Sequence, residues 1–209
     1  MPDTRKVTAS IKENVAYMNQ VLPVEESFDI VQREMTVGGR EASFYFINGF
    51  VNDESMLKIM DSLFGVKAEN MPGSVTAFVE CIPYVEVNVI GDFDQVFRNL
   101  LSGTACFFVD GYEACIVIDC RSYPARSVDE PDKDKSLRGS RDGFVETIVF
   151  NTALMRRRIR DSHLVMQMLE VGESSRTDVA VCYMSDRVDK ELLDNVMSRL
   201  KSIRTDALR

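Results

Sequence analysis

The residues best suited to specific recognition chemistry are six arginines in the stretch 138–160. They are Arg138, Arg141, Arg156, Arg157, Arg158 and Arg160. With Asp142 and Glu146 they give this stretch a charge of +4, so the remainder of a chain at −8 carries −12. A guanidinium pairs with a carboxylate or phosphate through two parallel hydrogen bonds. The stretch therefore predicts a docking surface for an acidic partner or another copy of the chain, or else a helix end whose cations pair with the acidic remainder.

Residues spaced for catalysis are missing from the sequence. It contains no Gly-x-Ser-x-Gly motif, no Walker-type phosphate loop and no cysteine–histidine pair at a plausible spacing. The single histidine, His163, has no neighbouring pair of ligands, which disfavours both a hydrolase triad and a metal site. Close carboxylates such as Asp92 and Asp94 fit helix capping better than acid–base catalysis. We therefore expect no enzyme activity, no metal and no cofactor.

The amino-acid composition narrows the class of protein further. Hydrophobic residues make up 45% and charged residues 28% of the 209-residue chain, values typical of a globular protein. The acidic pI of about 4.8 argues against general nucleic-acid binding. No stretch approaches the ~20 apolar residues that span a bilayer, so we expect this chain to be soluble. Five scattered cysteines without CxxC spacing indicate free buried thiols in a reducing compartment: Cys81, Cys106, Cys115, Cys120 and Cys182.

The arginines must be positioned by a helix. After the Asp142-Gly143 turn, apolar residues at 144, 148, 155 and 159 predict one apolar stripe of a helix that begins at Phe144. Glu146 would lie in the first turn and the arginines in the last turns, where the helix dipole favours them. Arg156, Arg157 and Arg158 are about 100° apart around the axis. At least one of them must therefore face other parts of the protein or a partner, or else lay its stem along the flank of the core.

The residues before this helix predict a first α/β lobe over 1–120, with an N-terminal helical arm. Gly38-Gly39 and Asp110-Gly111 lie between apolar runs and predict two hairpins. Patterning predicts helices over 10–22, 53–65, 73–81 and 93–101, with Asp53 and Asp92 as caps, and strands over 28–37, 41–47, 84–90, 105–109 and 114–119. We expect these strands to run in mixed directions.

A charged crossing loop over 121–143 should join this lobe to a second one over 144–209. The second lobe is predicted as helix, strand 164–171, strand 178–184 and helix 189–203, whose apolar stripe includes Leu192 and Val196. Residues 172–177 fit a polar hairpin loop better than an anion site. Such a lobe needs a neighbour to bury its sheet. The expected fold class is thus α/β with α+β character, in two small lobes with mixed sheets flanked by helices.

The stretch 121–161 carries a longer pattern. It reads Tyr-Pro-x-Arg, then Glu-Pro, then Arg-Gly-x-x-Asp-Gly-Phe-x-Glu, then Asn-x-x-Leu-x-Arg-x-Arg. This resembles the A-type subunits of the GerA family of bacterial spore germination proteins. The segments 27–60 and 100–126 are most similar to the stage V sporulation branch of that family. The resemblance extends from about residue 14 to residue 203.

The resemblance implies that this chain is the soluble N-terminal domain of a membrane protein. In members of this family, this domain precedes a set of membrane-spanning helices in the chain. The family members assemble in the spore inner membrane with other copies of themselves and with other germination-complex subunits. The resemblance also implies that the assembled subunits form an ion-conducting channel that responds to germination signals. The domain would then lie on the cytoplasmic side, in the spore core, and supply contacts between subunits through the arginine-rich helix.

Two other functions remain open at this point. A cleft between the two lobes could sense a germinant or another small-molecule signal. Its polar lining would be Arg121, Tyr123, Arg126, Arg138 and Arg141. The arginine helix could instead bind nucleic acid or phosphate, which the acidic remainder of the chain disfavours.

Overall fold

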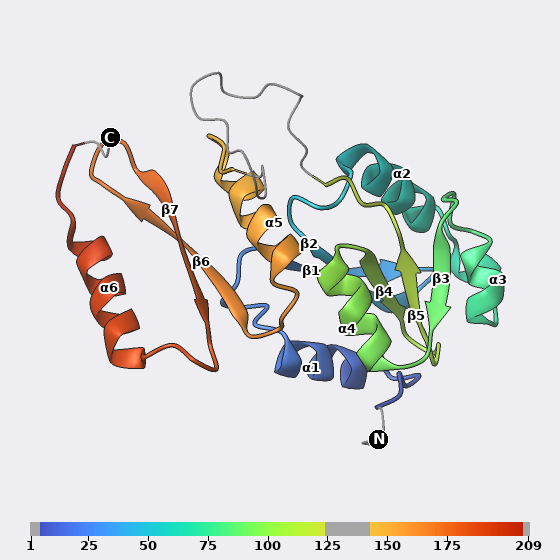
Figure 1. Cartoon of the computed structure of the whole chain (residues 1–209). Helices are drawn as coiled ribbons and strands as arrows, with labels where there is room; N and C mark the ends of the chain where they lie inside the picture. The colour runs from blue at the N-terminus through green and yellow to red at the C-terminus, as the bar shows by residue number, and fades with distance from the viewer. Residues whose placement is uncertain (1–4, 124–142, 207–209) are drawn as a thin grey trace, which may run out of the picture.

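The computed structural model describes residues 5–123 and 143–206. Figure 1 shows a sheet with helices on both sides, a long hairpin with one helix beside it, and α5 between these two parts. The α+β class predicted from the sequence is confirmed. Most of the predicted crossing loop lies outside the described residues, as do Arg126, Arg138 and Arg141.

The main sheet has five strands in the order β1-β2-β4-β5-β3. Their bounds are β1 Ile30–Val37, β2 Arg40–Ile47, β3 Val87–Ile90, β4 Ala105–Val109 and β5 Cys115–Ile118. Every neighbouring pair is antiparallel, so the prediction of mixed strand directions is wrong. The connection β3–α4–β4 does place two strands in the same direction. However, β5 lies between them and is antiparallel to both.

Helices cover both faces of this sheet. On one face lie α1 (Ile11–Val21) and α4 (Phe93–Ser102), and on the other lie α2 (Asp53–Phe64), the 3-10 turn Ala68–Asn70 and α3 (Val75–Val79). Strand β4 is buried throughout because its alternate side chains enter the two apolar layers. Asp92 caps α4 as predicted, whereas α2 is capped by Asn52 and not by Asp53. The Asn52 side chain accepts a hydrogen bond from Ser55 N at 2.9 Å.

The second part of the chain has the predicted element order. It comprises α5 (Ile148–Arg158), β6 (Leu164–Val171), β7 (Thr177–Met184) and α6 (Lys190–Ser202). Strands β6 and β7 form an antiparallel hairpin from Leu164↔Met184 to Val171↔Thr177, without a bulge. None of the residues of α6 is buried. This hairpin and its helix are therefore thinly covered compared with the main sheet.

Helix α5 differs from the prediction at its beginning and in its buried face. It begins at Ile148, because the Asn151 side chain accepts from Val145 N and donates to Val145 O, both at 2.7 Å, which turns the preceding chain away from the helix. Glu146 is therefore outside the helix. The predicted stripe is not the core face, since Phe144 and Ile159 are 67% and 38% exposed. The residues of α5 that are buried are Thr152, Ala153 and Arg156.

Candidate functional site

Helix α5 approaches the first lobe closely at one glycine. Gly49 has φ +84°, a conformation that favours glycine. A Cβ atom at this position would come within 3.1 Å of Val149 Cγ1 and 3.2 Å of Ala153 Cβ. The absence of a side chain at Gly49 thus lets α5 pack directly on the loop after β2.

The next turn of α5 places Arg156 inside the protein, with no exposed surface. Its Nε donates to Asp29 Oδ2 at 2.7 Å and its Nη2 to Asp29 Oδ1 at 3.2 Å. The guanidinium also donates to the main-chain oxygens of Asp161 and Leu164, each at 2.8 Å. Desolvating a charge is costly unless it is paired and hydrogen-bonded. Both conditions are met here, so Arg156 is a structural link between the lobes and not part of an exposed docking surface.

Asp29 lies just before β1 and is itself held by the second lobe. Ser27 Oγ donates to Asp29 Oδ1 at 2.6 Å and accepts from Met166 N at 2.9 Å. In the same place Phe28 N donates to Met166 O at 3.0 Å. We call Ser27, Asp29, Arg156 and Met166 the lobe junction. It connects the chain before β1, helix α5 and the first residues of β6 in one buried network.

A second group of residues lies where the chain leaves β5. Arg121 pairs with Asp119, with Nε at 2.6 Å from Oδ1, and its Nη1 donates to the Tyr123 hydroxyl at 3.1 Å. Hydrogen bonds from Arg121 lower the pKa of the Asp119 carboxyl below its usual value. The Tyr123 hydroxyl donates to Ser102 O at 2.7 Å. The Arg157 guanidinium lies over the Tyr123 ring, 4.5 Å from its centroid.

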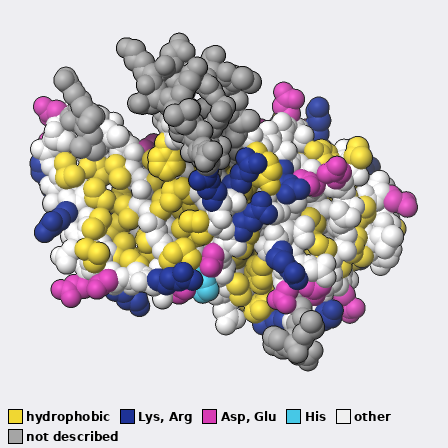
Figure 2. All heavy atoms as spheres, viewed as in Figure 1, with side chains coloured by type: hydrophobic (Ala, Val, Ile, Leu, Met, Phe, Trp, Pro, Cys, Tyr) yellow, Lys and Arg dark blue, Asp and Glu magenta, His cyan; other side chains and the backbone are white. Residues whose placement is uncertain are grey.

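The structure therefore brings together Arg121, Tyr123 and Arg157, which we call the Tyr123 cluster. Arg158 and Arg160 are exposed beyond it, and Arg160 Nε donates to Arg157 O at 3.3 Å at the end of α5. Figure 2 shows Lys and Arg side chains gathered in the middle of this face, over α5 and α4. Of the arginines predicted to form one surface, Arg156 alone among the described ones is withdrawn into the interior.

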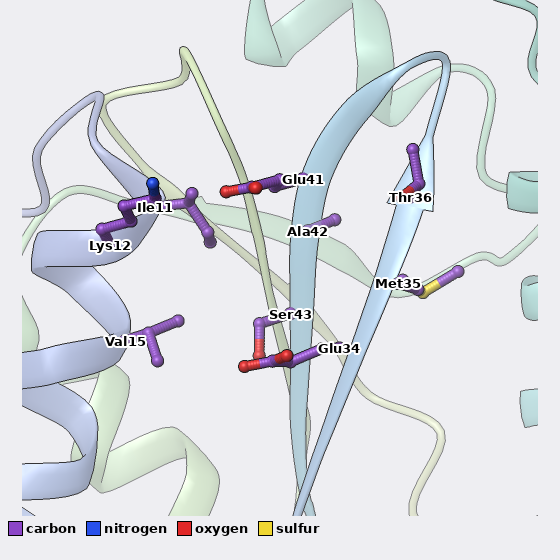
Figure 3. A pocket seen from close by; sticks show the side chains of 9 residues that line it. All are labelled: Ile11, Lys12, Val15, Glu34, Met35, Thr36, Glu41, Ala42 and Ser43. Atoms are coloured by element: carbon purple, nitrogen blue, oxygen red, sulfur yellow. The ribbon is translucent and has the colours of Figure 1, made fainter.

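A hollow of about 520 Å³ lies elsewhere, between α1 and the β1–β2 hairpin. In Figure 3 the carboxylates of Glu34 and Glu41 point toward α1, whereas Met35 points the other way. Its lining consists of Ile11, Lys12, Val15, Glu34, Met35, Thr36, Glu41, Ala42 and Ser43. This hollow contains none of the residues predicted to line a cleft between the lobes. Arg121 and Tyr123 use their polar groups within the Tyr123 cluster, and the cleft itself stays a prediction.

Groups of metal-ligating side chains are not found among the described residues. His163 is 54% exposed and its Nδ1 lies 2.8 Å from Asp161 Oδ1. All five cysteines are free, as expected, but Cys81 is exposed and Cys182 only half-buried. Within 5–123 and 143–206, the structure has no helix with the length and apolar character needed to cross a membrane.

Asp29 and Ser27 are the residues of this site that the sequence did not reveal. They precede β1 in a short polar segment with no motif, and their partners on α5 and β6 are more than a hundred residues away in the chain. The only available signal was the requirement that three consecutive arginines cannot share one helix face. That requirement left open whether one of the arginines faces other protein, faces a partner or lays its stem along the core, and it identified neither Arg156 nor Asp29.

Comparison with known proteins finds relatives that match nearly the whole chain. The family model described as Bacillus/Clostridium GerA spore germination protein matches residues 16–209. The stage V sporulation protein AF of Bacillus subtilis (strain 168) is 35% identical over an alignment of 214 residues, which covers 100% of this chain and 43% of that protein. The uncharacterized membrane protein YfkQ of the same organism is 28% identical, with coverage of 98% and 40%. The chain thus spans less than half the length of these relatives.

A solved structure has the same fold. The N-terminal domain of the A subunit of the Bacillus megaterium spore germinant receptor GerK3 superposes with a TM-score of 0.71. The superposition covers 97% of this chain and 75% of that one, at 20% sequence identity. At this identity the likeness concerns the fold alone.

Proposed function

Because the chain belongs to the GerA family of spore germination proteins, we propose that it supplies contacts between subunits of a membrane-embedded receptor or ion-channel complex. The partners would be other copies of the protein and other germination-complex subunits, at the spore inner membrane with this domain on the spore-core side. The observation that carries the proposal is that neighbouring arginines of α5 have different surroundings. Arg156 fixes the lobes internally, while Arg157, Arg158 and Arg160 face outward at the same helix end.

The electrostatics favour contact with an acidic partner. Arg157, Arg158 and Arg160 are exposed at the end of α5, whereas the whole chain carries a net charge of −8, so the end of α5 on one copy is attracted to the net negative charge of another. Complementary charges at an interface increase association rates and exclude wrong partners. The buried lobe junction also suits a contact role, since a rigid surface loses less conformational entropy on binding.

The test uses charge reversal in the full-length membrane protein. Arg157 and Arg160 are replaced by glutamate, and Arg156 is left unchanged because a glutamate there would face Asp29 in a buried site. The expected result is a smaller assembly after mild detergent extraction, measured by size-exclusion chromatography with light scattering. The matched control reverses Lys58 and Lys67, two exposed lysines in the first lobe, and should leave the size unchanged.

Comparing the α5 variant with the lysine control separates an effect on subunit contact from an effect on protein stability. Both variants carry the same change in net charge, so an effect confined to the α5 variant identifies the surface and not the overall charge. Equal melting temperatures of the two variants exclude a loss of folding. If the α5 variant keeps the wild-type assembly size, this surface does not supply the contact and the proposal is refuted.

A further inference from the structure

Helix α6 has more apolar surface than the hairpin covers. The inner row, Leu193, Met197 and Leu200, is half-buried, and α6 packs on β6. A second row lies about 100° around the helix and is open, with Leu192 61% exposed and Val196 39% exposed. We call Leu192 and Val196 the outer row. The sequence predicted one apolar stripe on this helix, and in the structure only part of that stripe is half-buried.

The described residues that follow α6 turn away from the outer row. Glu173 N donates to Thr205 O and Ser175 N donates to Asp206 O, both at 2.9 Å, so residues 203–206 return to the turn between β6 and β7. Figure 2 shows hydrophobic side chains spread over the part formed by β6, β7 and α6. Apolar surface of this kind, rimmed by charges, is typical of a protein contact.

The charges beside the outer row indicate which partner would bind there. Asp189 and Glu191 lie at the beginning of the helix, and Arg199 lies near its end on the same side as Leu192. A second α6 in antiparallel orientation would place its Arg199 beside these carboxylates, and the reverse pairing would form at the other end. A parallel arrangement would bring like charges together. The helix dipoles also favour the antiparallel arrangement.

We infer that the outer row of α6 docks on the α6 of a second copy of this protein, antiparallel and two-fold symmetric. Leu192 and Val196 of both copies pack together, and the acidic beginning of each helix pairs with Arg199 of the other. Such a self-complementary contact is the commonest kind in homo-oligomers. The inference rests on the proposed function, which it refines by adding a contact distinct from the end of α5.

Sedimentation analysis of the 209-residue chain over a range of concentrations tests the contact. Leu192→Glu with Val196→Glu should weaken self-association by about tenfold or more, since the contact would then have to bury unpaired carboxylates of like charge. The matched control is Leu57→Glu with Phe64→Glu on α2, where the exposed fractions are 62% and 54%. All four positions are exposed, so the variants should fold alike. An equal effect of both pairs, or a wild-type chain that remains monomeric, overturns the inference.

A charge exchange tests the orientation. Arg199→Glu alone should weaken the association, and adding Glu191→Arg on the same chain should restore much of it, because opposite charges then meet again at both ends. A heterologous contact with another surface would not be rescued by this exchange. Absence of rescue therefore overturns the antiparallel arrangement.

Disulfide trapping in the full-length membrane protein separates this inference from the proposed function. Val196→Cys, with Cys81→Ser to remove an exposed thiol, should form a covalent dimer on mild oxidation, and Leu57→Cys should not. If charge reversal on α5 reduces assembly while Val196→Cys gives no dimer, the α6 contact fails and the proposed function stands. If anionic vesicles bind the chain through the outer row and no dimer forms, the occupant is a membrane surface and the inference is refuted.

Discussion

Asp29 and Arg156 are 127 residues apart in the chain and form a buried ion pair with two hydrogen bonds. Their side chains are 1% and 0% exposed. The same guanidinium holds the main chain of Asp161 and Leu164, just before and at the beginning of β6. This pair of side chains thus links the hairpin β6–β7 and helix α5 to the chain that enters the main sheet, together with the hydrogen bonds of Ser27 and Phe28 to Met166.

Removing one partner of this pair should destabilise the protein strongly. Arg156→Met leaves Asp29 buried without a counter-charge, which typically costs about 3–5 kcal/mol of unfolding free energy. Arg157→Met, on the next residue of the same helix, is the matched control and should cost less than about 1 kcal/mol, because Arg157 is exposed. Urea unfolding followed by circular dichroism measures both.

The double variant tests whether the cost arises from the unpaired charge. Asp29→Asn combined with Arg156→Met removes both charges and should be less destabilised than the sum of the two single variants. Strict additivity, or an Arg156→Met variant no less stable than Arg157→Met, would show that the pair does not hold the lobes together.

Gly49 gives a second prediction about the same contact. Gly49→Ala forces a side chain into a left-handed conformation and against Val149, so it should lower the unfolding free energy by about 1–3 kcal/mol. Gly73→Ala is the matched control, because a Cβ atom there meets nothing within 4 Å. Thermal unfolding of the two variants should differ clearly. Equal melting temperatures would mean that α5 does not depend on close packing at Gly49.

The local elements of this fold could be predicted from the sequence because their signals are local. Gly38 and Gly39 both have positive φ, 55° and 76°, as the turn of the β1–β2 hairpin requires. Gly111, in the turn between β4 and β5, also has a positive φ, +87°. Side-chain caps and turn glycines act over a few residues, so the chain around them is sufficient to identify them.

The arrangement of these elements could not be predicted in the same way. The position of β5 between β3 and β4 depends on contacts across the sheet, so it cannot be predicted from the sequence of any one segment. Hydrophobic periodicity also misplaced the buried face of α5, because that face contains the polar residues Thr152 and Arg156. A buried arginine resembles an exposed one in sequence until its partner is known. Asp29 supplies that partner from the other lobe.

The thiols provide a check of the core that is independent of stability. Cys106, Cys115 and Cys120 are buried, and burial raises the pKa of Cys115 well above its usual value and that of Cys120 to about 11. A thiol that stays protonated and inaccessible reacts slowly. In the native protein, a thiol reagent such as Ellman's reagent should modify Cys81 first and the half-buried Cys182 more slowly, and the other three only after unfolding. Rapid reaction of more than two thiols would contradict the packing of β4 and β5.

The ion pair between Asp119 and Arg121 should make a small part of the stability depend on pH. Hydrogen bonds from Arg121 lower the pKa of Asp119 in the folded protein, whereas in the unfolded chain it returns to about 3.9. The pair therefore stabilises the fold above that value, and its contribution is lost as the pH falls through the folded pKa. Because the two side chains are 22% and 29% exposed, the contribution should stay below about 1 kcal/mol.

Urea midpoints of the wild type, Asp119→Asn and Arg121→Gln, measured from about pH 7 down to about pH 2, test this dependence. Each variant should be less stable than the wild type at neutral pH, because each loses the charged pair while the carboxylate of the wild type is ionised. The difference should shrink as acid protonates Asp119 in the wild type, since protonation removes the same attraction. A difference that keeps its full size at the lowest pH would show that the substitutions act through packing, and that the charge of Asp119 contributes nothing.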